Sequence, residues 1–358
     1  MRHSLPNCLM TKTSLSVQPS PVFKWAHICL VMAMFSTQIS AQTAQPPTSA
    51  SASPVAVTAV SASLPLTGPL SKQTMSRLLI TDAAKIGNRM VAVGDRGFIV
   101  YSDSNGETWE RAQTPPNVPM LTSIFFTDAK TGWAVGHDTF ILKSVDEGNS
   151  WTKAFSAPGE QKPLMSVLFT DANTGFAVGA YGAFYATTDA GQTWISRKIN
   201  DGDKHFNSII KIKDDQLLIV GEAGSILKSG DGGKNWLAVA SPYKGSFFGA
   251  IQAQDGSVIL YGLRGRIFRS ADTGLKSFSQ IDNKSTASIM GATKLSDGAL
   301  VLTGLAGLVL ISSDNGLSFT PLQTASTKAI SVALLGPPNA LVLFGETGAR
   351  DVMLPTKK

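Results

Sequence analysis

Cysteine is almost absent from this chain. Of 358 residues only Cys8 and Cys29 are cysteines, and both lie within the first 41. The rest of the chain therefore has no disulfide framework, no thiol nucleophile and no thiolate metal ligand. Histidine is also scarce, since only His137 and His205 follow residue 41 and they are far apart in sequence. This distribution argues against a histidine metal site, and we expect neither a metal nor a cofactor.

Charge is sparse as well. Only 16% of residues are charged, and the formal net charge is +6. Residues 1–41 contribute Arg2, Lys12 and Lys24 but no acidic residue, so 31 minus 3 leaves 28 basic against 25 acidic residues in the remainder, or +3. The basic residues are scattered rather than clustered. We therefore expect no nucleic-acid partner.

The N-terminus has the pattern of a secretory signal. Basic residues precede a short apolar run at 25–35, and small and polar residues follow it. Residues 1–41 are predicted to be a signal peptide cleaved near Ala41 or Ala44, which would place the protein in the periplasm or outside the cell. An uncleaved anchor is the alternative. Residues 42–53, rich in Pro, Ser, Ala, Thr and Gln, are predicted to be a flexible linker.

The body of the chain is a repeat. A short apolar strand ending in glycine recurs seven times, with successive glycines 41 to 43 residues apart. A Gly-x-x-Gly turn follows in six of the seven units, and then a second strand and the motif S-x-D-x-G-x-x-W or a variant of it. Four short strands in about 42 residues are typical of a propeller blade. Residues 54–358 are therefore predicted to be an all-β, seven-bladed β-propeller with four-stranded blades. The seven glycines are Gly94, Gly136, Gly179, Gly221, Gly262, Gly304 and Gly345.

The last unit is one strand short. It stops before its aromatic motif, while residues 54–66 before the first unit alternate apolar and small side chains. A propeller with a missing strand leaves an unpaired edge at its seam. We therefore predict that a strand from about 54–66 completes blade seven.

The motif S-x-D-x-G-x-x-W, as in residues 229–236, resembles a ligand loop at first sight. A calcium loop needs more oxygen ligands, and a phosphate loop needs a helix after its glycines. We instead predict a structural turn in which the Asp accepts backbone hydrogen bonds, the Gly takes a left-handed conformation and the Trp packs between blades. The predicted structural residues are Asp146, Trp151, Asp189, Trp194, Asp231, Trp236, Asp272 and Asp314.

These motifs resemble the Asp-box, or bacterial neuraminidase repeat. The whole unit, as in FFTDAKTGWAVGHDTFILKSVDEGNSW, is similar to the photosystem II stability/assembly factor family and its relatives in non-photosynthetic bacteria. The resemblance covers roughly residues 75–354. It implies a seven-bladed propeller outside the cytoplasm that acts as a non-enzymatic scaffold or assembly factor for a membrane complex, with a membrane-complex protein as its partner.

The alternative is a sialidase-like propeller that binds or hydrolyses glycans. That chemistry needs three arginines around a carboxylate, a Tyr nucleophile with a Glu partner, and an acid. The early Arg-Ile-Pro signature is absent, and Tyr181 and Glu222 form the nearest approach to a catalytic pair. We therefore expect no enzyme activity and assign no catalytic residue.

The topology predicts where a partner would bind. In a four-stranded blade, the turns between the second and third strands all open on one face, so the Gly-x-x-Gly turns would form a circle of variable residues on a constant scaffold. Solvated turns without a partner are the alternative for these positions. The predicted partner-binding residues are Arg96, His137, Tyr181, Glu222, Arg264, Arg266 and Glu346.

Overall fold

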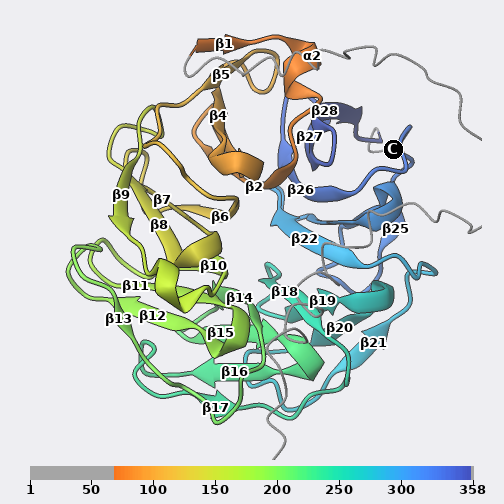
Figure 1. The fold of residues 1–358 in the computed structure, drawn as a ribbon. Helices are drawn as coiled ribbons and strands as arrows, with labels where there is room; N and C mark the ends of the chain where they lie inside the picture. The colour runs from red at the N-terminus through yellow and green to blue at the C-terminus, as the bar shows by residue number, and fades with distance from the viewer. Residues whose placement is uncertain (1–67, 356–358) are drawn as a thin grey trace, which may run out of the picture. The chain divides into compact units, whose positions relative to one another are not determined.

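Seven antiparallel sheets surround a common centre in the computed structural model, which describes residues 68–355 (Figure 1). The predicted fold class, an all-β seven-bladed propeller with four-stranded blades, is confirmed. One short α-helix lies between β1 (Gly68–Leu70) and β2 (Ile80–Ile86), the first two strands of the described chain. This helix, α2 (Lys72–Met75), begins after Ser71, whose Oγ accepts a hydrogen bond from the N–H of Thr74. Four residues are too few to give a helical period in the sequence.

The first four blades follow the chain in order. Blade one contains β1 (Gly68–Leu70), β2 (Ile80–Ile86), β3 (Arg89–Gly94), β4 (Ile99–Ser102) and β5 (Trp109–Arg111). Blade two contains β6 (Leu121–Phe126), β7 (Gly132–Gly136), β8 (Phe140–Ser144) and β9 (Thr152–Phe155). Blade three contains β10 (Leu164–Phe169), β11 (Gly175–Gly179), β12 (Phe184–Thr187) and β13 (Ile195–Ser196). Blade four contains β14 (Phe206–Lys211), β15 (Leu217–Gly221), β16 (Ile226–Ser229) and β17 (Leu237–Ala238).

The remaining blades continue the pattern. Blade five contains β18 (Phe247–Gln252), β19 (Val258–Gly262), β20 (Ile267–Ser270) and β21 (Ser279–Ile281). Blade six contains β22 (Ile289–Lys294), β23 (Leu300–Gly304), β24 (Val309–Ser312) and β25 (Thr320–Pro321). Blade seven contains β26 (Ile330–Leu335), β27 (Ala340–Gly345) and β28 (Gly348–Met353). Single 3-10 turns connect the second and third strands in blades one to six: η3 (Asp95–Gly97), η4 (His137–Thr139), η6 (Ala180–Gly182), η7 (Glu222–Gly224), η8 (Leu263–Gly265) and η9 (Leu305–Gly307). A further 3-10 turn, η5 (Pro158–Glu160), follows β9.

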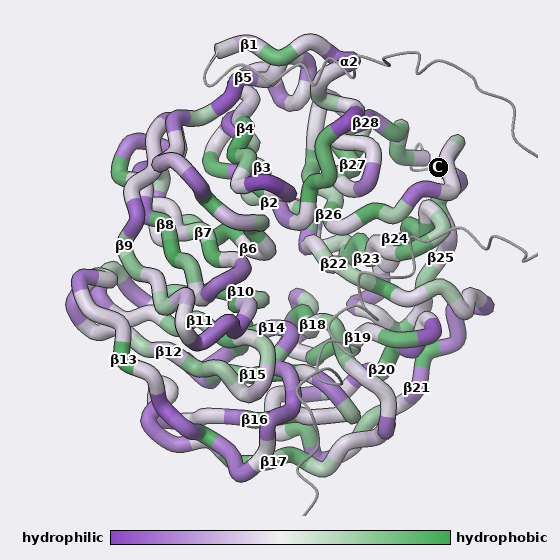
Figure 2. The backbone as a smooth tube through the Cα atoms, viewed as in Figure 1, coloured by the Kyte–Doolittle hydropathy of each residue, from purple (hydrophilic) through white to green (hydrophobic). Residues whose placement is uncertain are grey.

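Each blade places its first strand at the centre of the ring, and blades one to six place their fourth strand toward the rim. The first strands β2, β6, β10, β14, β18, β22 and β26 contact one another in that cyclic order, and β26 returns to β2. Hydrophobic residues gather along the middle strands, whereas the outer connections are largely hydrophilic (Figure 2). The second strands of blades two to five are buried along their whole length. This pattern follows because the second strand is covered by the neighbouring blade on each side.

Seven hydrophobic cores lie between neighbouring blades rather than inside them. Each core combines residues of two adjacent blades. In the core between blades seven and one, the Trp109 ring meets Phe344 edge-on at 5.6 Å between centroids. Removing apolar surface from water at every blade contact is the main force that holds such a ring together.

The ring closes by contact between blades seven and one. The Ser331 hydroxyl of β26 donates to the Ile80 carbonyl of β2 at 2.9 Å, and the Lys85 ammonium donates to the Leu335 carbonyl at 2.6 Å. Blade seven has three strands within the described residues. The segment 54–66 that we predicted as its fourth strand lies outside the described residues. The first described strand, β1, pairs instead with β5 at the rim of blade one.

No helix within residues 68–355 combines the length and hydropathy needed to cross a membrane. The predicted signal peptide and linker lie outside the described residues.

Candidate functional site

The candidate binding surface is formed by seven turns, one in each blade, that share the same backbone hydrogen bond. In every blade, the residue after the first turn glycine donates its backbone N–H to the carbonyl of the residue that precedes the first strand. The bond from Asp95 to Leu79 measures 3.0 Å, and the six equivalents measure 2.9 to 3.1 Å. The glycine leaves no room for a side chain, because a Cβ on Gly94 would lie 2.0 Å from the Leu79 oxygen. We call this surface, formed by the seven turns 94–97, 136–139, 179–182, 221–224, 262–265, 304–307 and 345–348, the turn face.

The third residue of the turn has a left-handed backbone in blades one to six. Its φ ranges from 51° at Ala223 to 59° at Arg264. Side chains other than glycine rarely take this conformation, so each turn stores a small strain that the surrounding hydrogen bonds maintain. Blade two has Thr139 in place of the second glycine, and it too has a positive φ of 55°. Its backbone N–H and its hydroxyl both donate to the Lys162 carbonyl at 3.0 Å, which compensates for the substitution.

Two of the predicted face residues have a structural role in their turns. Glu222 accepts a hydrogen bond from the backbone N–H of His205, and Glu346 accepts one from that of Ala329. Both N–H groups directly precede a first strand. Glu346 also pairs with the Lys328 ammonium at 2.8 Å. These two carboxylates therefore already have partners, which reduces their availability to a ligand.

The structure brings Tyr181 and His205 together. Their rings meet edge-on at 4.9 Å between centroids, and both side chains are half-buried. Because the His205 backbone also binds Glu222, the three residues form a small cluster across blades three and four. The sequence analysis singled out Tyr181 and Glu222 but considered His205 only as a candidate metal ligand. Its position directly before the first strand of blade four, next to the turns of blades three and four, could have identified it as part of the turn face.

His137 and Arg96 occupy neighbouring turns of the face. Burial lowers the pKa of the half-buried His137, and the nearby Asp138 carboxylate opposes this shift. His137 is therefore neutral at physiological pH and presents a hydrogen-bonding ring rather than a charge. The Arg96 side chain is 81% exposed and lies 3.7 Å from the carboxylate of its neighbour Asp95. An ion pair this exposed contributes little binding energy of its own.

Arg264 and Arg266 border a basic cleft in blade five. The cleft has a volume of about 520 Å³, and Lys284 and Asp282 from the following loop also line it, so that three cations face one carboxylate. The Asp282 carboxylate accepts a hydrogen bond from the backbone N–H of Lys284 at 2.9 Å. That loop is fixed by the buried Asn283, whose amide donates to the Gly265 carbonyl at 2.6 Å. Within residues 68–355, none of the three cations takes part in an ion pair. Three exposed cations around one concavity are suited to bind carboxylates. We call the three residues the basic cleft.

The S-x-D-x-G-x-x-W motifs form turns between the third and fourth strands, at the opposite ends of the strands from the turn face. We call them aspartate turns. In blade two, Asp146 accepts hydrogen bonds from the N–H and the hydroxyl of Ser150, at 2.9 and 2.6 Å, and from the Ser144 hydroxyl at 2.8 Å. Gly148 has a φ of 83°, and the Trp151 indole donates to its carbonyl. Asp189, Asp231 and Asp314 accept the corresponding bonds.

These bonds stabilise the charged form of the aspartates. They lower the pKa of both Asp189 and Asp231 to about 2, chiefly through the hydrogen bonds that each carboxylate accepts from the residue four positions on. In blade one Ser104 replaces the aspartate, and its hydroxyl accepts the Thr108 N–H at 2.8 Å. The carboxylates of the regular turns are thus saturated with donors of their own turn. This leaves them few free oxygens for a ligand.

Blade five departs from this pattern. Within the described chain, the Asp272 carboxylate accepts one hydrogen bond in its turn, from the Gly274 N–H at 2.7 Å. The extra residue of this turn places Leu275, rather than the glycine, in the left-handed region with a φ of 53°. Leu275 is buried in the core between blades four and five. The gain in apolar burial offsets the irregular turn.

The tryptophans of the aspartate turns pack against the preceding blade. Trp151 meets Phe126 within the core shared with blade one, and Trp236 meets the blade-three residue Phe184 at 5.7 Å between centroids. Trp194 packs edge-on against the fully buried Trp133 of blade two at 6.0 Å. These contacts place the indoles in cores, away from a ligand.

One buried acid was not singled out from the sequence. Asp82, in the first strand of blade one, accepts hydrogen bonds from the backbone N–H groups of Ala83 and Ile124, at 2.8 and 2.9 Å. Part of its surface remains accessible, but the surrounding strands remove most of its hydration, and burial raises its pKa to about 6. Serines occupy this strand position in blades two to four. A comparison of repeats position by position would have revealed the exception.

No metal centre is indicated within the described chain, where no three His, Cys, Asp or Glu side chains gather closely enough to hold an ion. Tyr181 and Glu222, the nearest approach to a catalytic pair, each contact His205: Tyr181 meets its ring, and Glu222 accepts a hydrogen bond from its backbone N–H. Their contacts maintain the turns that carry them.

Comparison with known proteins supports the identification of the repeat made from the sequence. The family model described as photosynthesis system II assembly factor YCF48 matches residues 144–307. No curated protein matches the chain in sequence. A solved structure of YCF48 bound to D1 peptide is 17% identical, covering 82% of this chain and 98% of that chain with a TM-score of 0.65. YCF48 from Cyanidioschyzon merolae is 16% identical, covering 81% and 99%, with a TM-score of 0.64.

The fold itself is shared more widely. Virginiamycin B lyase from Staphylococcus aureus is 11% identical, with 81% of this chain and 99% of that chain covered and a TM-score of 0.67. Likeness at such low identity establishes the fold alone. It does not establish a function, because proteins with the same propeller fold include both binding proteins and enzymes. The family match is more specific, because it follows the repeat itself. Residues 144–307 carry the repeat of the photosystem II assembly-factor family, and the resemblance predicted from the sequence is confirmed.

Proposed function

We propose that this protein is an exported, non-enzymatic propeller that binds a protein partner through its turn face and acts as a scaffold or assembly factor for a membrane complex. The basic cleft is the observation that carries this proposal. It presents three exposed cations without ion pairs in the described chain, on a face whose turns are held by the same backbone bond in every blade. One related structure was solved with a bound peptide, which supports a peptide or protein ligand here.

The partner chemistry follows from the charges. Arg264, Arg266 and Lys284 together favour an acidic segment of the partner, because guanidinium groups form two parallel hydrogen bonds with one carboxylate. Arg96 lies on the same face, three blades away around the ring, and adds a second positive point. Glu222 and Glu346 support the turns, so we assign them no direct contact with the partner. A rigid face with separate charged points suits an interface of ordinary size.

Export and the membrane complex rest on the sequence. The basic, apolar and small-residue segments of residues 1–41 support a secretory signal, and the family resemblance supports a partner in the envelope. The alternative, a sialidase-like propeller for glycans, would need a carboxylate pair that faces a pocket. Asp82 has the raised pKa of a general acid, but both of its oxygens accept backbone hydrogen bonds. The protein-binding function is therefore the better supported of the two.

An affinity capture from solubilised envelope tests this proposal. The mature protein, the double variant Arg264→Glu/Arg266→Glu and the control Lys234→Glu would be used as baits. Lys234 is exposed in an aspartate turn, at the opposite strand ends from the cleft. The proposal predicts a membrane protein that the wild type and the control retain and the double variant loses. Retention of glycan with no protein partner would favour the alternative.

A further inference from the structure

The third residue of each first strand lies at one level around the centre of the ring. In blades one and three its side chain accepts a backbone N–H of the next blade: Asp82 accepts that of Ile124 at 2.9 Å, and Ser166 accepts that of Ile209 at 3.2 Å. A polar side chain at this position therefore links neighbouring blades. From blade one to blade seven the residues are Asp82, Ser123, Ser166, Ser208, Gly249, Gly291 and Val332.

Blades five and six replace the missing side chain from their second strands. Gly249 pairs with Tyr261, and Gly291 pairs with Thr303. A Cβ on Gly249 would lie 2.1 Å from the Tyr261 hydroxyl oxygen, and a Cβ on Gly291 would lie 2.9 Å from that of Thr303. The Thr303 hydroxyl donates to the Ser331 carbonyl of blade seven at 3.0 Å, so it again links two blades.

The Tyr261 hydroxyl differs because it makes no hydrogen bond within residues 68–355. Tyr261 is only 6% exposed, and a buried hydroxyl without a partner costs free energy. Burial raises the pKa of Tyr261, and the nearby Asp82 carboxylate raises it further. Their strands, β2 for Asp82 and β18 for the paired Gly249, lie on opposite sides of the ring centre (Figure 1). The hydroxyl and the carboxylate therefore approach each other across the centre.

Asp82 has no counter-ion in the described chain. No basic side chain within residues 68–355 forms an ion pair with it. Lys85, on the same strand, instead donates to the Leu335 carbonyl and to Asn105. With a pKa of about 6, the carboxylate is mostly ionised at neutral pH. Buried charges in proteins are normally paired, so a positive group is missing here.

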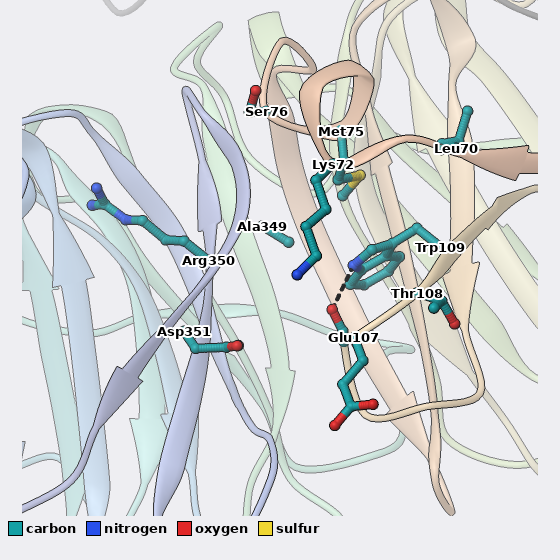
Figure 3. A pocket seen from close by; sticks show the side chains of 11 residues that line it. Leu70, Lys72, Met75, Ser76, Glu107, Thr108, Trp109, Ala349, Arg350 and Asp351 are labelled. Atoms are coloured by element: carbon teal, nitrogen blue, oxygen red, sulfur yellow. Dashed lines mark hydrogen bonds between the residues drawn. The ribbon is translucent and has the colours of Figure 1, made fainter.

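Another sheltered carboxylate of this protein shows such pairing. Asp351 lines a cavity of about 740 Å³ between α2, the aspartate turn of blade one and β28. Figure 3 shows the Lys72 side chain in this cavity, with Asp351 on the opposite wall. Burial raises the pKa of Asp351, and the positive charge of Lys72 opposes this shift. For Asp82, only uncharged groups oppose the effect of burial: the N–H groups of Ile124 and Ala83 and the Ser123 hydroxyl.

We propose that Asp82 and Tyr261 bind an ammonium group at the centre of the ring. A carboxylate has about four acceptor positions, so the three donors of the fold leave one for an N–H of the ligand, and the phenol oxygen accepts another. An ammonium group also supplies the missing charge. A divalent metal ion is the poorer fit, because it favours about six oxygen ligands and no three His, Cys, Asp or Glu side chains gather within the described chain.

The ammonium group belongs either to a small free amine or to a lysine side chain of a docked protein. The two sources share one chemistry, and the site selects for charge and N–H donors in both cases. The inference goes beyond the proposed partner binding, because the basic cleft attracts negative groups whereas this site attracts a positive one.

Titration of Asp82 by carboxyl NMR tests the proposal on the purified protein. Its signal is identified as the one that Asp82→Asn removes. The titration would be run in methylammonium, tetramethylammonium and sodium chloride at about 50 mM each, so that ionic strength is equal. Methylammonium should lower the pKa of Asp82 by at least about one unit relative to the other two salts, because only this cation combines charge with N–H donors. Equal pKa values in all three salts would overturn the proposal.

A hydroxyl deletion tests the part of Tyr261. Tyr261→Phe keeps the ring in the core between blades five and six. Tyr243→Phe, in the core between blades four and five, is the matched control. We expect methylammonium affinity, measured from the same pKa shift, to fall at least about fivefold in Tyr261→Phe and to stay unchanged in Tyr243→Phe. Unchanged affinity in Tyr261→Phe would contradict the assigned site.

A second probe distinguishes the two sources of the ammonium group. Nα-acetyl-lysine amide carries its ammonium on a four-carbon chain, as a lysine of a docked protein does. The same shift in the pKa of Asp82 with this probe would support a lysine side chain. A shift with methylammonium alone would support a small free amine, and a shift with neither probe would overturn the proposal.

Discussion

The Asp82 carboxylate accepts a hydrogen bond from the backbone N–H of Ile124 at 2.9 Å, and this bond joins the first strands of blades one and two. The carboxylate gains two backbone donors but loses most of its hydration, and burial has the larger effect, because its pKa is raised from 3.8 to about 6. Asp82 therefore links two blades, and the free-energy cost of burying its carboxylate depends on pH because only the ionised form is penalised.

The first prediction concerns that cost. Since the folded protein holds the Asp82 proton more tightly than the unfolded chain, the contribution of this residue to stability is fully present below pH 4 and declines as the pH rises to about 6. A pKa difference of about two corresponds to roughly 3 kcal/mol. The free energy of unfolding of the wild type minus that of Asp82→Asn should fall by about this amount between pH 4 and pH 7. Urea unfolding at several pH values measures it, and a constant difference would refute the assignment.

The second prediction compares two aspartate turns. Asp146→Ala removes an acceptor used by the Ser150 N–H, the Ser150 hydroxyl and the Ser144 hydroxyl. We expect it to lower the free energy of unfolding by about 1–3 kcal/mol. Asp272→Ala in blade five is the matched control, because that carboxylate accepts a single backbone bond in its turn. Thermal unfolding should show a clearly smaller effect for Asp272→Ala; equal effects would mean that the extra bonds of Asp146 add no stability.

The third prediction concerns two positions of one turn. A Cβ on Gly304 would lie 2.2 Å from the Ser288 carbonyl oxygen, so Gly304→Ala must displace the backbone. Its cost should exceed about 2 kcal/mol. Ala306, two residues later, has a φ of 56°, and Ala306→Gly relieves a left-handed alanine at a cost in chain entropy, so we expect a change within about 1 kcal/mol of zero. Denaturant titration of both variants distinguishes them, and similar destabilisation by both would contradict the role given to the first glycine.

The fourth prediction concerns the basic residues that join blades. The Lys228 ammonium donates to the Thr273 carbonyl of the next blade at 2.6 Å, and the Lys143 ammonium makes the same bond to Ala190 at 2.9 Å. Lys228→Met keeps most of the apolar stem but loses the bond, which should lower the free energy of unfolding by about 1 kcal/mol. The exposed Lys276→Met serves as the control. A Lys228 variant as stable as that control would show that the bond does not contribute.

The repeat could be predicted from the sequence because each of its signals has a local cause. The first turn glycine recurs because a carbonyl occupies the space of its side chain, as at Gly94, and the aspartate recurs because its own turn supplies the donors, as at Asp146. Period and turn chemistry together gave the number of blades, and the structure confirms the fold class. The aromatic packing between blades follows from the same pattern, as Trp109 against Phe344 shows.

Relations between blades were harder to predict. The cluster of Tyr181, His205 and Glu222 depends on which residues of adjacent units meet in space, and a single sequence does not contain that information. The basic cleft was hard to predict for the same reason, because it also combines residues of separate segments. Arg264 and Arg266 were identified from their turn, whereas Lys284 belongs to a loop with no repeated motif. Placement of β1 on blade one was also not foreseen, because three residues carry no strand period.

The central claim is that the basic cleft of the turn face binds an acidic protein partner. The most direct test is the equilibrium affinity of the purified protein for the membrane protein recovered by capture, measured at about 50 mM and about 300 mM salt. We predict that Arg264→Glu/Arg266→Glu binds at least about tenfold more weakly than the wild type at low salt, that the difference narrows at high salt, and that Lys234→Glu binds as the wild type does. Wild-type affinity in the double variant at both salt concentrations would contradict the claim.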